Sequence, residues 1–345
     1  MRHGCHRHSA FAEKVQAMTP PGHSADRLPY CCTLRDTLDA DEHAACLTNW
    51  QQRYDQLTAG SFAGVFEEFC FGRLQLFREG LNQSVHQVGG AWPGSRTFAV
   101  PIAIEGTGSF GGAAYDANSM LTLGGNDELD FRTPRRLEIL ACSADSSALN
   151  DYAMQVDHRD LEAELAGHRL APTTPEGISL LGSLLATMMA GLRATPELLK
   201  HPQMRKAMEQ AVFATLLDSV STGTARTTAA PCCSARQQLV ARARAYMEAH
   251  IDEVITVADL CVELGVSRRT LQYSFQDVLD LNPVKFLRAI RLNAVRRALK
   301  AADQSRGATV ADIAARWGFW HLSHFSAEYK AMFSELPSET LKRPS

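Results

Sequence analysis

The sequence lacks the features that mark membrane, secreted and zinc-ribbon proteins. It contains no run of about 18 apolar residues that could cross a bilayer, and its first residues lack the apolar stretch of a signal peptide. Its nine cysteines include no CxxC spacing, so we expect free thiols rather than a disulfide framework or a zinc site. The chain is therefore predicted to be cytoplasmic, with no membrane contact.

Patterns typical of catalysis are also missing. There is no GxSxG motif and no phosphate-binding loop. The glycine-rich segment between residues 60 and 145 holds one histidine, His86, and one histidine cannot supply the ligands of a metal-using barrel enzyme. We predict no catalytic residue, no metal site and no catalytic cofactor. A barrel enzyme of the cupin type, joined to the basic C-terminal module described next, is kept as the alternative.

Charge divides the chain into two unequal parts. Of the 35 basic and 38 acidic residues, 16 and 12 lie from Arg236 onward, so this part carries +4 and the remainder −7. A basic module beside an acidic one is typical of nucleic-acid contact at one end only. The excess of +4 is too small to favour broad, nonspecific binding.

The first 45 residues show no apolar periodicity, and residues 1–45 are predicted to form a disordered tail. Four residues there could bind a metal instead, because imidazole and thiol ligands lie close together. They are His3, Cys5, His6 and His8.

Apolar periodicity predicts an α+β protein. A short helix is predicted over residues 47–57, and then the period changes to two, with glycine turns between the runs. The β-like runs are 62–77, 97–104, 120–123 and 137–142. The later stretches 180–192 and 202–220 carry apolar stripes at helical spacing, which would cover the sheet or pair two subunits.

These patterns place three units in order. Residues 46–220 are predicted to form a β-rich, cupin-like sensor domain with covering helices, which also offers a surface for dimerisation. Residues 221–235 are rich in small polar residues and predict a flexible linker. Residues 236–345 are predicted to form an all-α domain.

The all-α part states one pattern twice. The segment 256–260 (TVADL) returns 53 residues later at 309–313 (TVADI), whereas Leu271 and the apolar positions after it return at a spacing of 54. Each copy holds a glycine, Gly265 or Gly318, at which a helix can end in the left-handed conformation. The repeat predicts two helix-turn-helix motifs, and the second has one extra turn residue.

The second helix of the first copy offers side chains suited to reading bases. Ser267 is a predicted cap, and burial of Leu271 would turn Arg268, Gln272 and Gln276 outward together. Arg and Gln can form paired hydrogen bonds with guanine and adenine in the major groove. A solvated helix face is the alternative. Arg269 and Tyr273 complete the predicted contacts of this copy.

The second copy offers less base-reading chemistry. Its predicted contacts are Ser323, His324 and Lys330, so we expect it mainly to position the domain. The helix predicted over 284–301 would be roughly 27 Å long, which approaches the spacing of about 34 Å between successive major grooves. Its basic residues are candidates for phosphate contacts or for a solvated surface: Arg288, Arg291, Arg296, Arg297 and Lys300.

Several segments together resemble the DNA-binding module of the AraC/XylS family of bacterial transcription regulators over residues 237–341. They are 267–271 (SRRTL), Pro283 with 286–287 (FL), 318–319 (GF), 324–326 (HFS) and Pro337. The resemblance implies an activator that binds double-stranded operator DNA, contacts RNA polymerase and responds to a small-molecule effector. Ser334 departs from the glycine usual in this family.

A narrower resemblance connects 50–52 (WQQ), 92–93 (WP) and 317–322 (WGFWHL) to regulators of ethanolamine utilisation operons. It implies ethanolamine as effector and cobalamin as co-effector. An ammonium ligand needs a carboxylate and an aromatic face. The candidate effector-binding residues are Glu67, Glu68, Glu79, Trp92 and Phe98. An effector-independent DNA-binding protein is a further alternative, and the sequence leaves dimerisation open.

Overall fold

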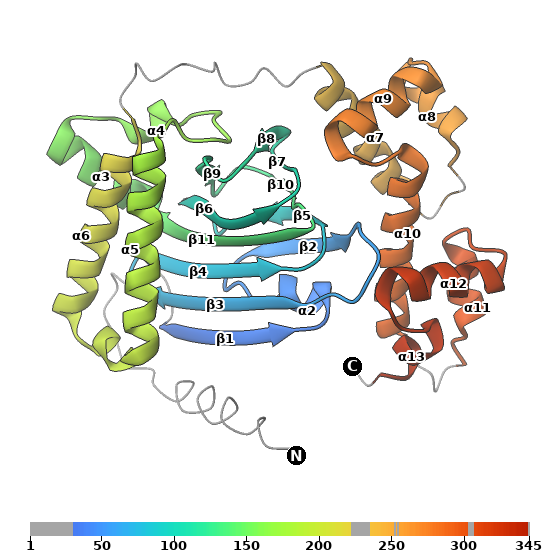
Figure 1. The fold of residues 1–345 in the computed structure, drawn as a ribbon, viewed down its shortest axis with the longest axis horizontal. Coiled ribbons are helices and arrows are strands. Elements are labelled where there is room, and N and C mark those ends of the chain that lie inside the picture. The colour runs from blue at the N-terminus through green and yellow to red at the C-terminus, as the bar shows by residue number, and fades with distance from the viewer. Residues whose placement is uncertain (1–29, 222–234, 252, 254, 303–306, 344–345) are drawn as a thin grey trace.

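The computed structural model describes residues 30–221, 235–251, 253, 255–302 and 307–343. Its N-terminal domain is built on two antiparallel sheets that enclose a shared apolar core (Figure 1). The larger sheet has the order β1 (Cys31–Thr37), β3 (Gly64–Phe71), β4 (Leu74–Leu81), β11 (Arg136–Asp145), β6 (Ser95–Glu105) and β9 (Leu121–Gly124). The smaller sheet has the order β2 (Gln51–Gln56), β5 (Val85–Gly90), β10 (Leu129–Arg132), β7 (Gly108–Phe110) and β8 (Ala113–Tyr115).

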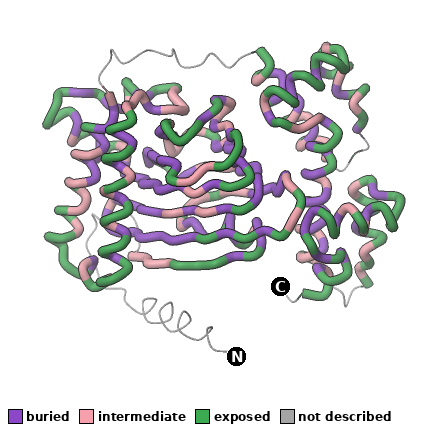
Figure 2. The backbone as a smooth tube through the Cα atoms, in the orientation of Figure 1, coloured by how far each residue is buried: buried purple, intermediate pink, exposed green. Residues whose placement is uncertain are grey.

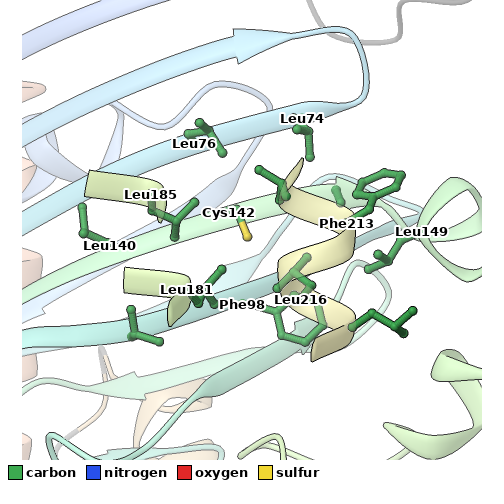
Figure 3. Close-up of a cluster of buried hydrophobic side chains, with 14 of the residues drawn as sticks. Leu74, Leu76, Phe98, Leu140, Cys142, Leu149, Leu181, Leu185, Phe213 and Leu216 are labelled. Carbon is green, nitrogen blue, oxygen red and sulfur yellow. The ribbon is translucent and has the colours of Figure 1, made fainter. Parts of the chain in front are cut away.

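Strand alternation separates an inner from an outer core. On β4 the side chains of Leu74 and Leu76 face outward, whereas Phe77 packs with Phe110 and Phe131 of the smaller sheet. Helices cover the outer face: α3 (Ser146–Asp157), α4 (Leu161–Glu164), α5 (Pro175–Ala194), η1 (Pro196–Lys200) and α6 (Pro202–Ser219). Figure 3 shows side chains of these helices packed on the outer face of the sheet.

Helix α5 is long and apolar enough to span a membrane by length and composition, which the search for long apolar runs missed. Its buried residues pack on the outer face of the larger sheet as a core layer, and Leu181 and Leu185 are fully buried there. In Figure 2 the strands are mainly buried, whereas the covering helices alternate between buried and exposed positions. This alternation is typical of an amphipathic helix on a sheet.

Two local predictions are wrong. The predicted tail 1–45 extends too far, because residues 31–37 form β1 and residues 40–44 form helix α2 (Ala40–Ala44). The predicted helix over 47–57 is instead β2, whose ladder with β5 supplies backbone hydrogen bonds that local periodicity cannot reveal. Residues 1–29 of the predicted tail, with its possible metal ligands, and most of the predicted linker 221–235 lie outside the described residues.

The C-terminal domain consists of helices and contains both predicted motifs. Its helices are α7 (Ala235–Ala249), α8 (Val257–Leu264), α9 (Arg268–Leu279), α10 (Pro283–Lys300), α11 (Val310–Arg316), α12 (Leu322–Phe333) and α13 (Pro337–Lys342). The first helices of the two motifs begin 53 residues apart and the second helices 54 apart. The predicted α+β class, with a β-rich first domain and an all-α second domain, is confirmed.

Candidate nucleic-acid interface and effector cavity

The first motif is fixed by its caps. Thr256 and Asp259 form a reciprocal capping box at the start of α8, and Gly265 ends that helix at φ 64°. Ser267 Oγ accepts the backbone N–H of Thr270 at 3.1 Å at the start of α9. Leu271 is fully buried, so the opposite side of α9 must face solvent.

That solvent side carries most of the predicted first-motif contacts. Arg268, Arg269, Gln272 and Tyr273 are all exposed, and the Arg269 guanidinium lies 5.3 Å from the centre of the Tyr273 ring. Gln276 is exposed but donates to Asp280 at 2.6 Å. Its side chain is therefore engaged within the helix, which weakens its predicted role in reading a base.

The second motif is built differently. Helix α12 has no side-chain cap, and Phe325 and Tyr329 form its buried side as predicted. Ser323, His324 and Lys330 are exposed. The sequence interpretation missed Trp320, which precedes His321, the N-cap residue of α12.

Trp320 is 80% exposed and contacts His321, with ring centroids 3.5 Å apart and the ring planes tilted by 37°. Its neighbour Phe319 is only 6% exposed. The signal that could have identified it is an aromatic residue that follows a buried one at the start of the second recognition helix.

The basic residues of α10 that were predicted to contact phosphate form two groups, and the first consists of Arg288, which pairs with Glu328 of α12, and Arg291. Arg291 lies in a groove between the motifs, beside Trp317 and Gly318, and its guanidinium donates to the Glu253 carbonyl. Burial, and then the nearby Arg288, lower the pKa of Arg291. The predicted contact of Arg291 with DNA stays a prediction.

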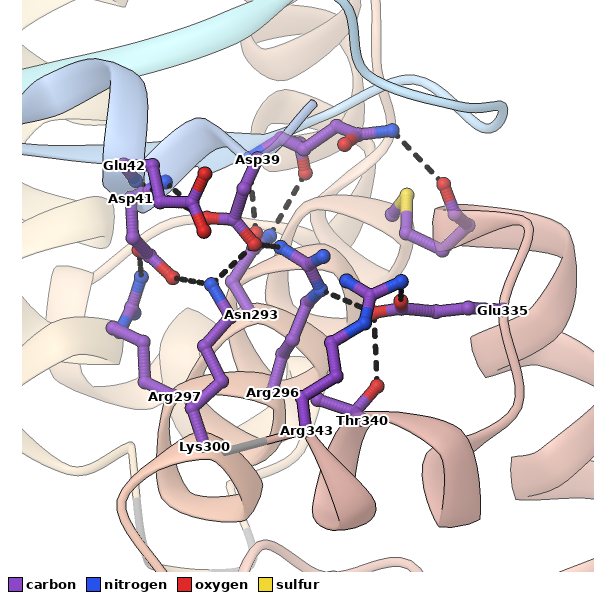
Figure 4. Close-up of polar contacts among 12 residues, drawn as sticks. Asp39, Asp41, Glu42, Asn293, Arg296, Arg297, Lys300, Glu335, Thr340 and Arg343 are labelled. Atoms are coloured by element: carbon purple, nitrogen blue, oxygen red, sulfur yellow. Dashed lines mark hydrogen bonds and ion pairs between the residues drawn. The ribbon is translucent and has the colours of Figure 1, made fainter. Parts of the chain in front are cut away.

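The other group faces the N-terminal domain (Figure 4). Arg296 Nη1 lies 2.6 Å from Asp39 Oδ2, and Arg297 Nη1 lies 2.8 Å from Asp55 Oδ1. Lys300 Nζ lies 2.9 Å from Asp41 Oδ2. The expectation that these three basic residues contact phosphate is corrected for this arrangement, because acidic side chains already neutralise them.

Three hydrogen bonds to backbone groups of Gln56 and Gly60 also join the domains. The Gln56 N–H donates to Asn293 Oδ1 at 3.0 Å, and the Asn293 amide donates to the Gln56 carbonyl at 2.9 Å. The Gly60 N–H donates to the Met332 carbonyl at 3.1 Å. Helix α10 lies between the two motifs in the sequence and packs on both. These contacts therefore hold both motifs against the N-terminal domain.

The predicted effector residues fall on opposite faces of the larger sheet. Glu67 lies on the outer face, where it pairs with Arg193 of α5, and Phe98 is buried in the outer core. Neither faces the interior of the barrel, so their assignment to an effector site is corrected. The reason is strand alternation, which sends Glu67 and Glu68 to opposite faces.

Glu68 and Trp92 belong to a closed polar cluster. Glu68 Oε1 accepts the Gln75 amide at 2.6 Å, and Gln75 Oε1 accepts both the Trp50 and the Trp92 ring N–H, at 2.9 and 3.1 Å. Burial raises the pKa of Glu68. These side chains already satisfy one another, so they offer a ligand few free hydrogen bonds.

Glu79 remains as the carboxylate of a small cavity inside the barrel. The cavity has a volume of about 40 Å³ and is lined by Tyr54, Gln87 and aromatic side chains that include Phe77 and Phe131. The Tyr54 hydroxyl donates to Glu79 Oε1 at 2.7 Å, and the Gln87 amide lies 3.4 Å from both carboxylate oxygens. Glu79 Oε2 is therefore the oxygen with weaker partners among the described residues.

Cys31 and Cys70 lie opposite each other in the β1–β3 ladder and form a disulfide. The expectation of free thiols is wrong for this pair, because strand register brings together cysteines 39 residues apart. Glu68 lies beside them and completes a group of three residues with potential metal-ligand atoms. Sulfur atoms joined in a disulfide are not thiolates, so this arrangement does not form a metal site.

Comparison with known proteins places these features. A family model described as a helix-turn-helix domain matches residues 260–343. The probable thc operon regulatory protein of Rhodococcus erythropolis is 34% identical over 203 residues, which cover 55% of this chain and 60% of that relative. The XylDLEGF operon transcriptional activator 3 of Pseudomonas putida is 25% identical over 142 residues, with 41% of each chain covered. The chain thus spans less than two thirds of these relatives.

Two solved structures are also similar. A probable AraC family regulator from Rhodopseudomonas palustris is 33% identical, with 31% of this chain and 96% of that chain covered and a TM-score of 0.29. The AraC-like activator CuxR is 16% identical, with coverages of 81% and 98% and a TM-score of 0.39.

Residues 260–343 are thus a DNA-binding helix-turn-helix domain. The motif residues that resemble the AraC/XylS family lie within or next to this domain. The relatives named above are regulators rather than enzymes, as predicted.

Proposed function

We propose that the protein is a sequence-specific transcription regulator, acting as an activator, whose N-terminal domain controls operator binding in response to a small molecule. The observation that carries the proposal is the pair of unequal motifs on α10, of which the first exposes Arg268 and Gln272 on a capped helix. In this proposal the regulator acts in the cytoplasm and contacts RNA polymerase beside its operator. Exposed Leu180 on α5 supports a homodimer formed through the covering helices.

A gel-shift experiment tests operator recognition. Duplexes selected from a random pool by the wild-type protein are compared with scrambled duplexes. Arg268→Ala with Gln272→Ala removes two base-reading side chains, each worth about 1–3 kcal/mol of discrimination, and we expect the preference for selected DNA to be lost while nonspecific binding remains. The matched control, Arg136→Ala with Gln203→Ala, changes exposed residues of the N-terminal domain and should keep the preference.

For the effector we propose a small organic ammonium compound, with ethanolamine as the candidate. A carboxylate, Glu79, beside aromatic side chains supports a cation, and a volume of about 40 Å³ limits the ligand to a few heavy atoms. Calorimetry should detect ethanolamine but not ethylene glycol, which has the same length without the charge. Glu79→Gln should abolish the heat of binding. Equal binding of both compounds would refute a site selective for cations.

Cobalamin as co-effector does not fit this cavity, because a corrin ring is far larger than about 40 Å³. Its binding to another part of the chain is proposed only from the resemblance to ethanolamine regulators. Equilibrium dialysis of the full chain with cobalamin, with and without ethanolamine, tests it directly. The proposed control of DNA binding by an effector at Glu79 does not require it.

A further inference from the structure

Helix α2 contacts the barrel on one side and the DNA-binding domain on the other. It comprises Ala40–Ala44 and follows the cap residue Asp39. Asp39 and Asp41 lie against α10, whereas His43 lies against Glu79 of the cavity. Helix α2 and its cap residue thus contact both the candidate effector site and helix α10, on which both motifs pack.

On the barrel side, His43 is held at one ring nitrogen only. Its Nδ1 lies 2.7 Å from Thr37 Oγ1. Its Nε2 lies 3.2 Å from Glu79 Oε1, but off the direction of a hydrogen bond, and has no aligned partner among the described residues. The ring is 1% exposed. A buried polar atom without an aligned partner is unfavourable, so the position of His43 depends on what the Glu79 carboxylate binds.

On the other side, one carboxylate performs two tasks. Asp39 Oδ1 accepts the backbone N–H groups of Asp41 and Glu42, at 2.9 and 3.2 Å, and thereby caps α2. Asp39 Oδ2 pairs with Arg296 and Lys300 of α10. Burial alone would raise the pKa of Asp39, but the two cations outweigh it and lower the pKa. A rotation of α2 cannot keep both the cap and the ion pairs in place.

We propose that α2 couples the barrel cavity to the docking of α10. A ligand that binds Glu79 shifts His43, α2 moves with its histidine, and Asp39 and Asp41 loosen their hold on Arg296 and Lys300. Since α10 packs on α9 and α12, the relative placement of the two recognition helices then changes. The inference rests on the proposed function for its biological role, but the coupling itself is a property of the free chain.

Hydrogen exchange measures the coupling without DNA or ligand. The Gln56 and Gly60 N–H groups donate across the domain interface, so their exchange reports undocking directly. Coupling between sites is commonly about 5–150-fold. We expect Glu79→Gln and His43→Ala each to speed exchange at these two amides at least about fivefold, because both changes disturb the contact between α2 and the barrel.

The matched control is Thr122→Val, which changes the same cavity. Thr122 Oγ1 is buried without a hydrogen-bond partner among the described residues, and valine has the same shape, so exchange at Gln56 and Gly60 should stay as in the wild type. Asn293→Ala removes the acceptor of the Gln56 N–H and shows the full size of the signal. Amides between β4 and β11 report the integrity of the barrel.

The proposal is overturned if Asn293→Ala speeds exchange whereas Glu79→Gln leaves the interface amides unchanged, or if Thr122→Val has the same effect as Glu79→Gln. If His43→Ala also speeds exchange between β4 and β11, its fold is disturbed and the isosteric Glu79→Gln decides alone. A wild-type protein with no preference for selected over scrambled DNA in the gel shift would refute the proposed function without altering these exchange rates, so the two failures are distinguishable.

Discussion

The two helix-turn-helix motifs differ in the side chains that they expose and in the contacts that hold them in place. The first exposes Arg268 and Gln272 and contacts the N-terminal domain through its preceding helix α7, where Arg244 Nη1 lies 2.9 Å from Asp130 Oδ1. The second exposes Ser323 and His324. It is held by a buried network of hydrogen bonds that joins α10, α12 and α13. The two motifs thus differ in base-reading chemistry and are held in place by different polar contacts.

Removal of Arg296 should have the largest effect. Its guanidinium is nearly buried and pairs with Asp39 of the N-terminal domain and with Glu335, 2.9 Å away, in the segment between α12 and α13. Breaking a buried pair leaves uncompensated charge and costs about 3–5 kcal/mol. We expect Arg296→Ala to lower the free energy of unfolding by about 3 kcal/mol in denaturant titration.

Arg136→Ala is the matched control for that measurement. Arg136 also pairs with a carboxylate, Glu105, but both side chains are well exposed. A surface pair contributes about 0–1 kcal/mol. Equal losses of unfolding free energy for Arg296→Ala and Arg136→Ala would contradict the distinction between a buried, paired arginine and a solvated one.

The difference in base reading comes next. Ser323→Ala with His324→Ala should lower operator affinity only about threefold and leave the preference over scrambled DNA intact, since these side chains are expected mainly to contact the backbone. Arg268→Ala with Gln272→Ala should lower that preference about 100-fold. A competition gel shift with both double variants measures the comparison. A larger loss of preference for the Ser323→Ala, His324→Ala variant would show that the second motif reads the bases instead.

These contrasts also divide what local sequence could predict from what it could not. The repeat, the caps at Thr256 and Ser267 and the buried side of each recognition helix are local signals, because a helix bonds within itself. Strand β2 was mistaken for a helix because its ladder partner lies elsewhere in the chain. Likewise, Arg296 could not be assigned to Asp39, since the pair forms only when two domains dock.

The candidate effector site could likewise be predicted only in part from local sequence. The sequence suggested acidic and aromatic residue types, but only strand pairing decides that Glu79 faces the cavity while Glu67 faces α5. Trp320 was missed because apolar periodicity assigns aromatic residues to the core. Exposure depends on the neighbouring helices, which the sequence pattern does not place.

The contact between α7, which precedes the first motif, and the N-terminal domain should respond to pH. His86 is buried and its Nε2 lies 3.0 Å from Asp130 Oδ1, beside Arg244 of α7. Burial, and then the Arg244 charge, lower the pKa of His86, whereas Asp130 and Asp55 act in the opposite direction. The neutral ring is therefore the folded form. Stability from this group is present above the unfolded value of about 6.5 and is lost as pH falls toward the lowered folded pKa.

The measurement compares denaturant unfolding at pH 7.5 and 5.5 for the wild type and for His86→Gln, which cannot titrate. We expect the wild type to lose about 1 kcal/mol more than the variant over this interval. A pH dependence that is identical in both proteins would show that another group causes it. Arg244 and Asp130 are unchanged in this comparison, so the difference isolates the imidazole.

The smallest effect concerns the ends of the recognition helices. Asp280 ends α9 and Ser334 ends α12, both in the left-handed conformation, with φ of 52° and 58°. A residue with a Cβ is strained there, whereas glycine is not. Ser334→Gly should therefore raise the free energy of unfolding by about 0.5–1 kcal/mol, the strain relieved minus the entropy that glycine adds to the unfolded chain.

Asp280→Gly sharpens the comparison, because Asp280 also accepts the Gln276 amide at 2.6 Å. Its replacement relieves the same backbone strain but loses an exposed side-chain contact, so the gain should be smaller than for Ser334. Paired thermal unfolding of the two variants measures the difference. If both glycines stabilise equally, the Gln276 contact contributes nothing. Gln276 would then be free to face the major groove, and its predicted role in reading a base would regain support.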